Sequence, residues 1–205
     1  MSKGRRLGRT RRKIVVACVA AAIVSSGTAA LATHVDNMYP TANYNHTCVG
    51  GGRETKFCKT DSYWLTYFRQ ISLSDTGKTR IWSVLDVEFS PTDLTIRNED
   101  PPVYSGASET DVIYHYRSDL ADHVVGTVWC NDAATSTHCD QHYAAFDSPS
   151  PTRSVICHET GHSVGLTHGP AADPPLAIDD ASLGCMSNPI DDLGPHNTNM
   201  INATY

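Results

Sequence analysis

Three histidines and a glutamate with metal-binding spacing stand out between residues 157 and 169, where the chain reads C-H-E-T-G-H-S-V-G-L-T-H-G. His158 and His162 are four residues apart, so on a helix they lie on one face, one turn apart. Two such imidazoles can bind one Zn²⁺ at about 2.0–2.1 Å. Gly165 lets the chain turn sharply out of the helix, so that His168 can supply a third nitrogen. Three histidine ligands leave a fourth position open for water, which is typical of catalytic zinc sites.

Glu159 follows the first ligand directly and can face the water without binding the metal. Zinc lowers the pKa of a bound water from 15.7 toward roughly 7. We therefore expect Glu159 to act as the general base, which takes a proton from the attacking water and passes it to a departing amine. The alternative is a helix with satisfied surface histidines, which would require a chance match at five fixed positions.

The pattern H-E-x-x-H-x-x-G-x-x-H resembles the zinc signature of the metzincin metalloproteases, whose second hallmark is a downstream Met-turn. Residues 183–187 read L-G-C-M-S and place Met186 18 residues after His168. The resemblance implies that Met186 forms an apolar floor beneath the histidines and is not a ligand; the alternative is an ordinary core methionine. It also implies a zinc metalloendopeptidase with one catalytic Zn(2+), similar to the small secreted bacterial matrixins or snapalysins.

The chain departs from these relatives at several positions. Snapalysins carry Asp at the third ligand, where this chain has His168, and astacins and serralysins carry a Tyr where it has Asn188. Matrixins add a structural zinc bound through an H-x-D element. We favour solvated loop and strand histidines over a second zinc; they are His115, His123, His138 and His142.

The elements that must position these residues follow from hydrophobic spacing. We expect strands at 62–69, 94–97, 111–116, 124–129 and 142–146, and helices at 75–89, 153–164 and 195–205. This order is that of an α+β domain. The resemblance refines it to a zincin-like fold: a mixed twisted sheet, an active-site helix, and a C-terminal Met-turn and helix. It also implies an exposed edge strand that pairs with an extended peptide or protein substrate, for which the candidate residues are Val124, Val125, Gly126, Thr127 and Val128.

The first 32 residues have the order of a secretory signal peptide. A basic start precedes the uncharged run 14–24, and A-L-A at 30–32 is a cleavage site. An uncleaved membrane anchor is the alternative, and Arg11-Arg12 would permit twin-arginine export. Cleavage would leave nine Lys and Arg against 22 Asp and Glu, a net charge of −13. We expect a secreted, extracellular monomer without stable membrane association, and the acidic balance argues against nucleic-acid binding.

Six cysteines remain once Cys18 leaves with the leader, and an even count in an exported protein indicates disulfides. Of the 15 pairings that six cysteines allow, local spacing favours two, Cys48–Cys58 and Cys130–Cys139, which leaves Cys157–Cys185. We therefore divide the remainder into a disulfide-pinned N-terminal segment, 33–60, and a catalytic domain, 61–205.

Loop carboxylates near the motif could also bind Ca(2+), although no EF-hand spacing is present and a solvated acidic surface is favoured. These residues are Asp173, Asp179, Asp180, Asp191 and Asp192. Two other functions compete with the endopeptidase: a non-enzymatic secreted binding module that keeps zinc for structure, and a zinc hydrolase of another amide, such as a cell-wall peptide.

Overall fold

The computed structural model describes residues 34–106, 108–187 and 189–205. The expected signal peptide, residues 1–32, lies outside these residues, as does Asn188. The residues from 34 onward belong to one compact unit, which contains both the N-terminal segment and the expected catalytic domain. Within the described part of the chain, no helix has the length and apolar character needed to cross a membrane.

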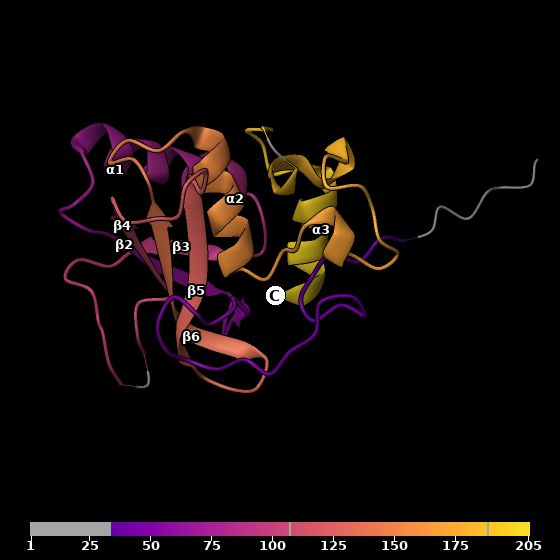
Figure 1. Cartoon of the computed structure of the whole chain (residues 1–205). Coiled ribbons are helices and arrows are strands. Elements are labelled where there is room, and N and C mark those ends of the chain that lie inside the picture. Colours follow the sequence, from indigo (N-terminus) through magenta and orange to yellow (C-terminus); the bar gives the residue numbers. More distant parts are fainter. Residues whose placement is uncertain (1–33, 107, 188) are drawn as a thin grey trace, which may run out of the picture. The chain divides into compact units, whose positions relative to one another are not determined.

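A six-stranded sheet forms the centre of this unit (Figure 1). Its strands are β1 (Lys59–Thr60), β2 (Trp64–Arg69), β3 (Thr95–Asn98), β4 (Val112–Tyr116), β5 (Gly126–Ala133) and β6 (His138–Phe146). The order is β1-β6-β4-β2-β3, and β5 also pairs with β6. Every pairing is parallel except that of β5 with β6, which is antiparallel. This mixed, mainly parallel sheet with its helices is compatible with the expected α+β class.

Three α-helices accompany the sheet. They are α1 (Asp75–Val84), which continues as a π-helical turn over Leu85–Phe89, α2 (Arg153–Ser163) and α3 (Gly194–Thr204). The side chain of Ser74 accepts a hydrogen bond from Gly77 N at 3.0 Å and so caps α1. Two 3₁₀ segments, Gly169–Ala171 and Ala181–Met186, interrupt the region between α2 and α3 that the sequence predicts to be loop.

The main core lies between the sheet and helices α1 and α2. Alternate strand residues such as Leu65, Val112 and Tyr114 share this core with Ile81 of α1 and Ile156 of α2, and all five are fully buried. Because side chains alternate across a strand, this face requires apolar residues at every second position. The core therefore fixes α2, the helix that carries the metal-binding motif, against the sheet.

Three disulfides, Cys48–Cys58, Cys130–Cys139 and Cys157–Cys185, match the pairing that local spacing favours. Several disulfides in a chain of this size fit an extracellular protein, because the cytosol keeps thiols reduced. The first pins the N-terminal segment, the second joins β5 to β6, and the third joins α2 to the 3₁₀ segment before α3.

The expected strand boundaries need correction at the edge of the sheet. Strand β5 begins at Gly126 and extends to Ala133, so Val124 and Val125 precede it. The reason is a turn: Val124 N donates to Ala121 O at 3.0 Å, which ends the extended pairing there. Strand β6 begins at His138, four residues before the expected start, because β5 continues to pair with it through the polar residues near Cys139. The sequence did not predict the two-residue strand β1 at all.

Candidate metal centre

Helix α2 carries the first two histidines. Thr152 caps the helix by accepting a hydrogen bond from Val155 N. His162 lies four positions after His158, so both rings project from one face, with their centroids 4.7 Å apart. The helix thus supplies two ligand nitrogens on a rigid element.

Gly165 turns the chain back toward this face. Its φ of +97° lies in the left-handed region, and a side chain there would also contact Met38 and Lys59. His168 then reaches the other two histidines, and its Nε2 lies 2.9 Å from Nε2 of His158 and 3.1 Å from Nε2 of His162. The three predicted ligands therefore converge.

Backbone carbonyls orient two of the rings. Nδ1 of His158 donates to Cys185 O at 2.8 Å, and Nδ1 of His162 donates to Leu166 O at 2.8 Å. Since a carbonyl only accepts, both Nδ1 atoms carry the proton, and the Nε2 lone pairs point toward the other rings. Burial lowers the pKa of all three imidazoles, that of His168 to about 4, so the rings are neutral at pH 7.

This donor set fits zinc. Tetrahedral ligands at about 2.0–2.1 Å from zinc are separated by roughly 3.3 Å, close to the observed Nε2 separations. Neutral imidazoles with their Nδ1–H groups hydrogen-bonded to carbonyls are the usual form of histidine ligands. The other cluster of potential ligands among the described residues, Cys48, Cys58 and Cys130, is occupied by disulfides.

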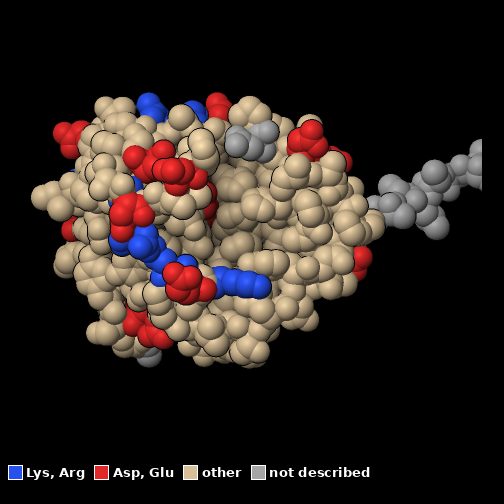
Figure 2. Space-filling model, in the orientation of Figure 1, with Lys and Arg blue, Asp and Glu red and all other residues tan. Residues whose placement is uncertain are grey.

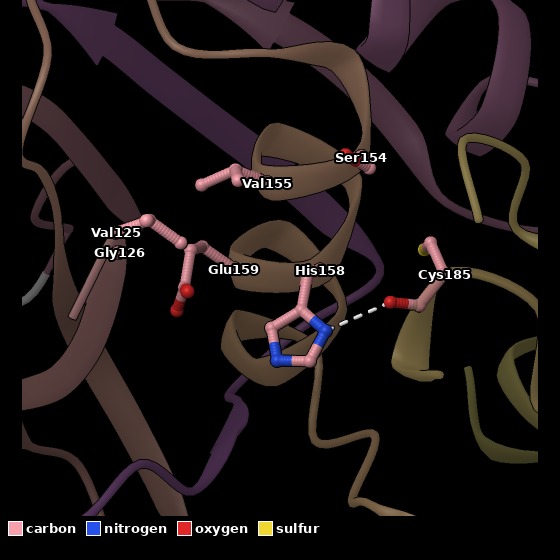
Figure 3. A pocket seen from close by; sticks show the side chains of 7 residues that line it. All are labelled: Val125, Gly126, Ser154, Val155, His158, Glu159 and Cys185. Carbon is pink, nitrogen blue, oxygen red and sulfur yellow. Dashed lines mark hydrogen bonds between the residues drawn. The ribbon is translucent and has the colours of Figure 1, made fainter. Parts of the chain in front are cut away.

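Glu159 lies on the same helix beside a cavity of about 130 Å³. His158 and Glu159 line this cavity together with Val125, Gly126, Ser154, Val155 and Cys185, as Figure 3 shows. The Glu159 side chain is only 4% exposed, and no described residue forms a hydrogen bond with its carboxylate. Burial therefore raises the pKa of this carboxyl to about 8. A carboxyl group of this kind beside three convergent imidazoles can move a proton at a metal-bound substrate.

Met186 is fully buried next to the histidines. Its Sδ occupies the space that a side chain at Gly161 would need, and the residue lines a second cavity with His158 and His168. Cys157 and Cys185 form the disulfide that ties α2 to the segment containing Met186. This bridge also fixes the carbonyl that orients His158.

Three residues of the centre lie far from the motif and were missed in the sequence. Phe57 stacks on His162 with ring centroids 4.4 Å apart, and Met38 packs at Gly165. The backbone carbonyl of Asn37 accepts a hydrogen bond from Thr167 N at 2.7 Å, directly before the third ligand. Spacing within the sequence carries no signal for such contacts, because they form only when the N-terminal segment folds back onto the turn after α2.

Figure 2 shows a hollow on the face drawn in Figure 1, with Lys and Arg side chains below it and Asp and Glu side chains on its left. Of the five expected edge residues, Val125 and Gly126 line the cavity beside Glu159, while Thr127 and Val128 continue along β5.

Among the remaining candidate residues, Asp179 lines the second cavity with His158 and His168. His142 is buried and bonds to Cys58 O at 3.1 Å, and His138 bonds to neighbouring threonine hydroxyls. Among the acidic loop residues, Asp180 caps the backbone of Ser182, and no three of these carboxylates converge within the described part of the chain.

No protein-family model matches this chain, and no curated protein resembles it at a significant level of sequence similarity. The function of the centre must therefore be argued from its own geometry.

Proposed function

We propose that this chain is a secreted zinc-dependent endopeptidase of the metzincin type, with a zincin-like catalytic domain. One observation carries the proposal: three neutral imidazoles converge, and one of them, His158, lines a cavity beside the edge strand of the sheet together with the buried Glu159. Cavities with convergent polar groups of perturbed pKa are the places where catalytic sites are found.

When bound to the three histidines, a zinc ion would supply an acidified water and polarise the scissile carbonyl. The Cys185 and Leu166 carbonyls hold two imidazoles with Nε2 turned inward. In its ionised form, which a nearby cation favours, Glu159 takes one proton from the attacking water, whose oxygen joins the carbonyl carbon. As the C–N bond breaks, Glu159 delivers that proton to the departing nitrogen. Met186 is buried, and its Sδ fills the space beside Gly161 on the helix that carries the first two histidines.

The substrate class follows from the edge strand β5. An extended peptide can add to its unpaired side by backbone hydrogen bonds, which places a peptide bond next to Glu159. The signal-like leader and the three disulfides support action outside the cell. We expect one catalytic zinc per chain, with calcium as a further ligand to be tested.

Glu159 also separates this function from the alternative of a zinc-holding binding module. A structural site needs no carboxylate at an open cavity, and structural zinc is usually held by four protein ligands instead of three. Burial of an unpaired carboxylate costs stability, so its place beside the ligands favours catalysis. Hydrolysis of another amide, such as a cell-wall peptide, uses the same groups and differs in the substrate alone.

The decisive experiment compares casein or gelatin hydrolysis by the unmodified protein and by Glu159→Ala, both purified from the medium of a secreting host. Zinc content is measured on both. We expect about one zinc in each and hydrolysis only by the unmodified protein. If both bind zinc and neither cleaves protein or cell-wall peptide, the endopeptidase proposal fails.

A further inference from the structure

The outer side of β5 offers unpaired backbone groups at one end. Successive residues of a strand direct their N–H and C=O groups to opposite sides. The carbonyl of Val125 accepts a hydrogen bond on the β6 side at 3.1 Å, whereas Cys130 N donates outward to Lys56 O at 3.3 Å. Alternation then directs the groups of Gly126 and Val128 outward, and no hydrogen bond among the described residues occupies them.

The other end of the same edge is already covered. Besides the bond from Cys130 N to Lys56 O, Thr55 Oγ1 donates to Cys130 O at 2.6 Å. One residue further on, Gly51 N donates to Asn131 O at 2.8 Å. From Cys130 onward, therefore, residues 51–56 occupy the place that a bound peptide would take.

Covalent bonds and close packing hold this cover in place. The Cys48–Cys58 disulfide closes the segment on itself, and the Cys130–Cys139 disulfide fixes the covered strand to β6. Gly50 lies so close to β5 that a Cβ there would be 2.8 Å from Asn131 O. Disulfides and close backbone packing thus hold residues 51–56 against β5.

Glu159 sets the position of the scissile bond along β5. A general base that protonates the departing nitrogen must lie beside that nitrogen. Glu159 contacts Gly126 and lines the cavity there with Val125 and Val155. A peptide that pairs antiparallel with β5, with its departing nitrogen beside Glu159, therefore has the residues before the scissile bond opposite the stretch from Thr127 to Cys130.

We propose, on the basis of the endopeptidase function above, that the N-terminal side of the substrate is limited to about three extended residues before the scissile bond. Only Thr127, Val128 and Trp129 lie between the position beside Glu159 and the covered Cys130. These positions span about 10 Å at roughly 3.3 Å per residue. The substrate class is therefore a peptide whose chain ends or turns away after three residues on this side.

Peptide hydroxamates test this limit without depending on turnover. A C-terminal hydroxamate binds the zinc and fixes the register, so that one to six alanine-rich residues before it occupy the N-terminal side. We expect the affinity for the zinc-loaded, secreted protein to rise about fivefold per residue up to three, since a net hydrogen bond contributes about 1 kcal/mol. Further residues should change it less than twofold. Continued gains from the fourth to the sixth residue, or no binding at any length, would overturn the proposal.

Two glycine variants test whether residues 51–56 impose the limit of three residues. In Gly50→Val the side chain collides with the β5 backbone and displaces the cover, so the fourth and fifth residues should now add affinity. Gly52→Val is the matched control, because no atom lies within 4 Å of a Cβ at that position, and it should retain the limit of three. An unchanged limit in a folded Gly50→Val with both disulfides formed would show that residues 51–56 do not impose it. Casein hydrolysis, measured separately, reports on the endopeptidase function itself.

Discussion

Because Gly126 has no side chain, the Glu159 carboxylate can lie directly against β5. A side chain at position 126 should therefore displace this carboxylate. A Cβ at Gly126 would lie 2.6 Å from Glu159 Oε1, 2.9 Å from its Cγ and 3.0 Å from its Cδ. Ordinary van der Waals contact begins at 3.4 Å, so the carboxylate in Gly126→Ala must move by about 0.8 Å. Glu159 lines a cavity of about 130 Å³, so its carboxylate can move into this space, away from its position beside β5.

We expect Gly126→Ala to lower kcat by about 10- to 100-fold, since a misplacement of about 1 Å can cost on the order of 100-fold. That loss corresponds to about 1.4–2.7 kcal/mol of transition-state stabilisation. Alanine retains the N–H and C=O groups of residue 126, so peptide pairing with β5 and therefore KM should change little. The three histidines lie on α2 and after the turn at Gly165, and none of them contacts the added methyl group, so zinc content should stay at about one per chain.

The assay is steady-state hydrolysis of a fluorogenic peptide, with zinc measured by mass spectrometry and folding by thermal unfolding. Gly52→Ala is the control, because its Cβ would meet open space. A folded, zinc-loaded Gly126→Ala protein with the kcat of the unmodified protein would refute the reasoning. Glu159 would then either tolerate the displacement or not be the base.

Three further changes test the supports of the centre. Replacing Cys157 and Cys185 by serine should lower the free energy of unfolding by about 3.5 kcal/mol for a loop of 28 residues, measured by urea denaturation. Asn37→Ala leaves buried partners unsatisfied, so it should cost about 1–3 kcal/mol of stability and weaken zinc binding in a chelator competition, because Asn37 also contacts Thr167. Burial raises the pKa of Asp111 from 3.8 to about 6, so its contribution to stability is full below pH 3.8 and is lost as the pH rises through about 6. The unmodified protein should therefore lose about 3 kcal/mol over this range relative to Asp111→Asn, and parallel pH profiles would contradict the assignment.

Local signals in the sequence predicted most of the elements. The N-cap Thr152, the spacing of the helical histidines and the glycine at the end of α2 are all encoded within residues 152–165. Aromatic, β-prone composition predicts β2, and alternation predicts β4, although four consecutive residues of β4 are buried. The convergence of His168 with the helical pair follows from the same short stretch.

Strand boundaries that depend on distant partners could not be predicted from local sequence. The polar start of β6 at His138 is a strand because β5 and a disulfide hold it, and its composition alone favours a loop. The strong strand propensity of Val124 and Val125 predicts a start of β5 two residues too early. In the structure, a turn ends the pairing there. The two-residue β1 is defined only by its partner in β6.

The metal centre therefore depends on more than its eleven-residue motif. The turn after α2 ends in an irregular segment, and a ligand on such a segment loses conformational freedom when it binds metal. Contacts from the N-terminal segment reduce that cost before binding: Met38 packs at Gly165, Asn37 bonds to Thr167, and Phe57 stacks on His162. The same segment covers the far end of β5. The same disulfide-pinned segment, residues 34–60, thus supports the position of His168 and covers one end of β5, so it packs as part of the compact unit that contains α2.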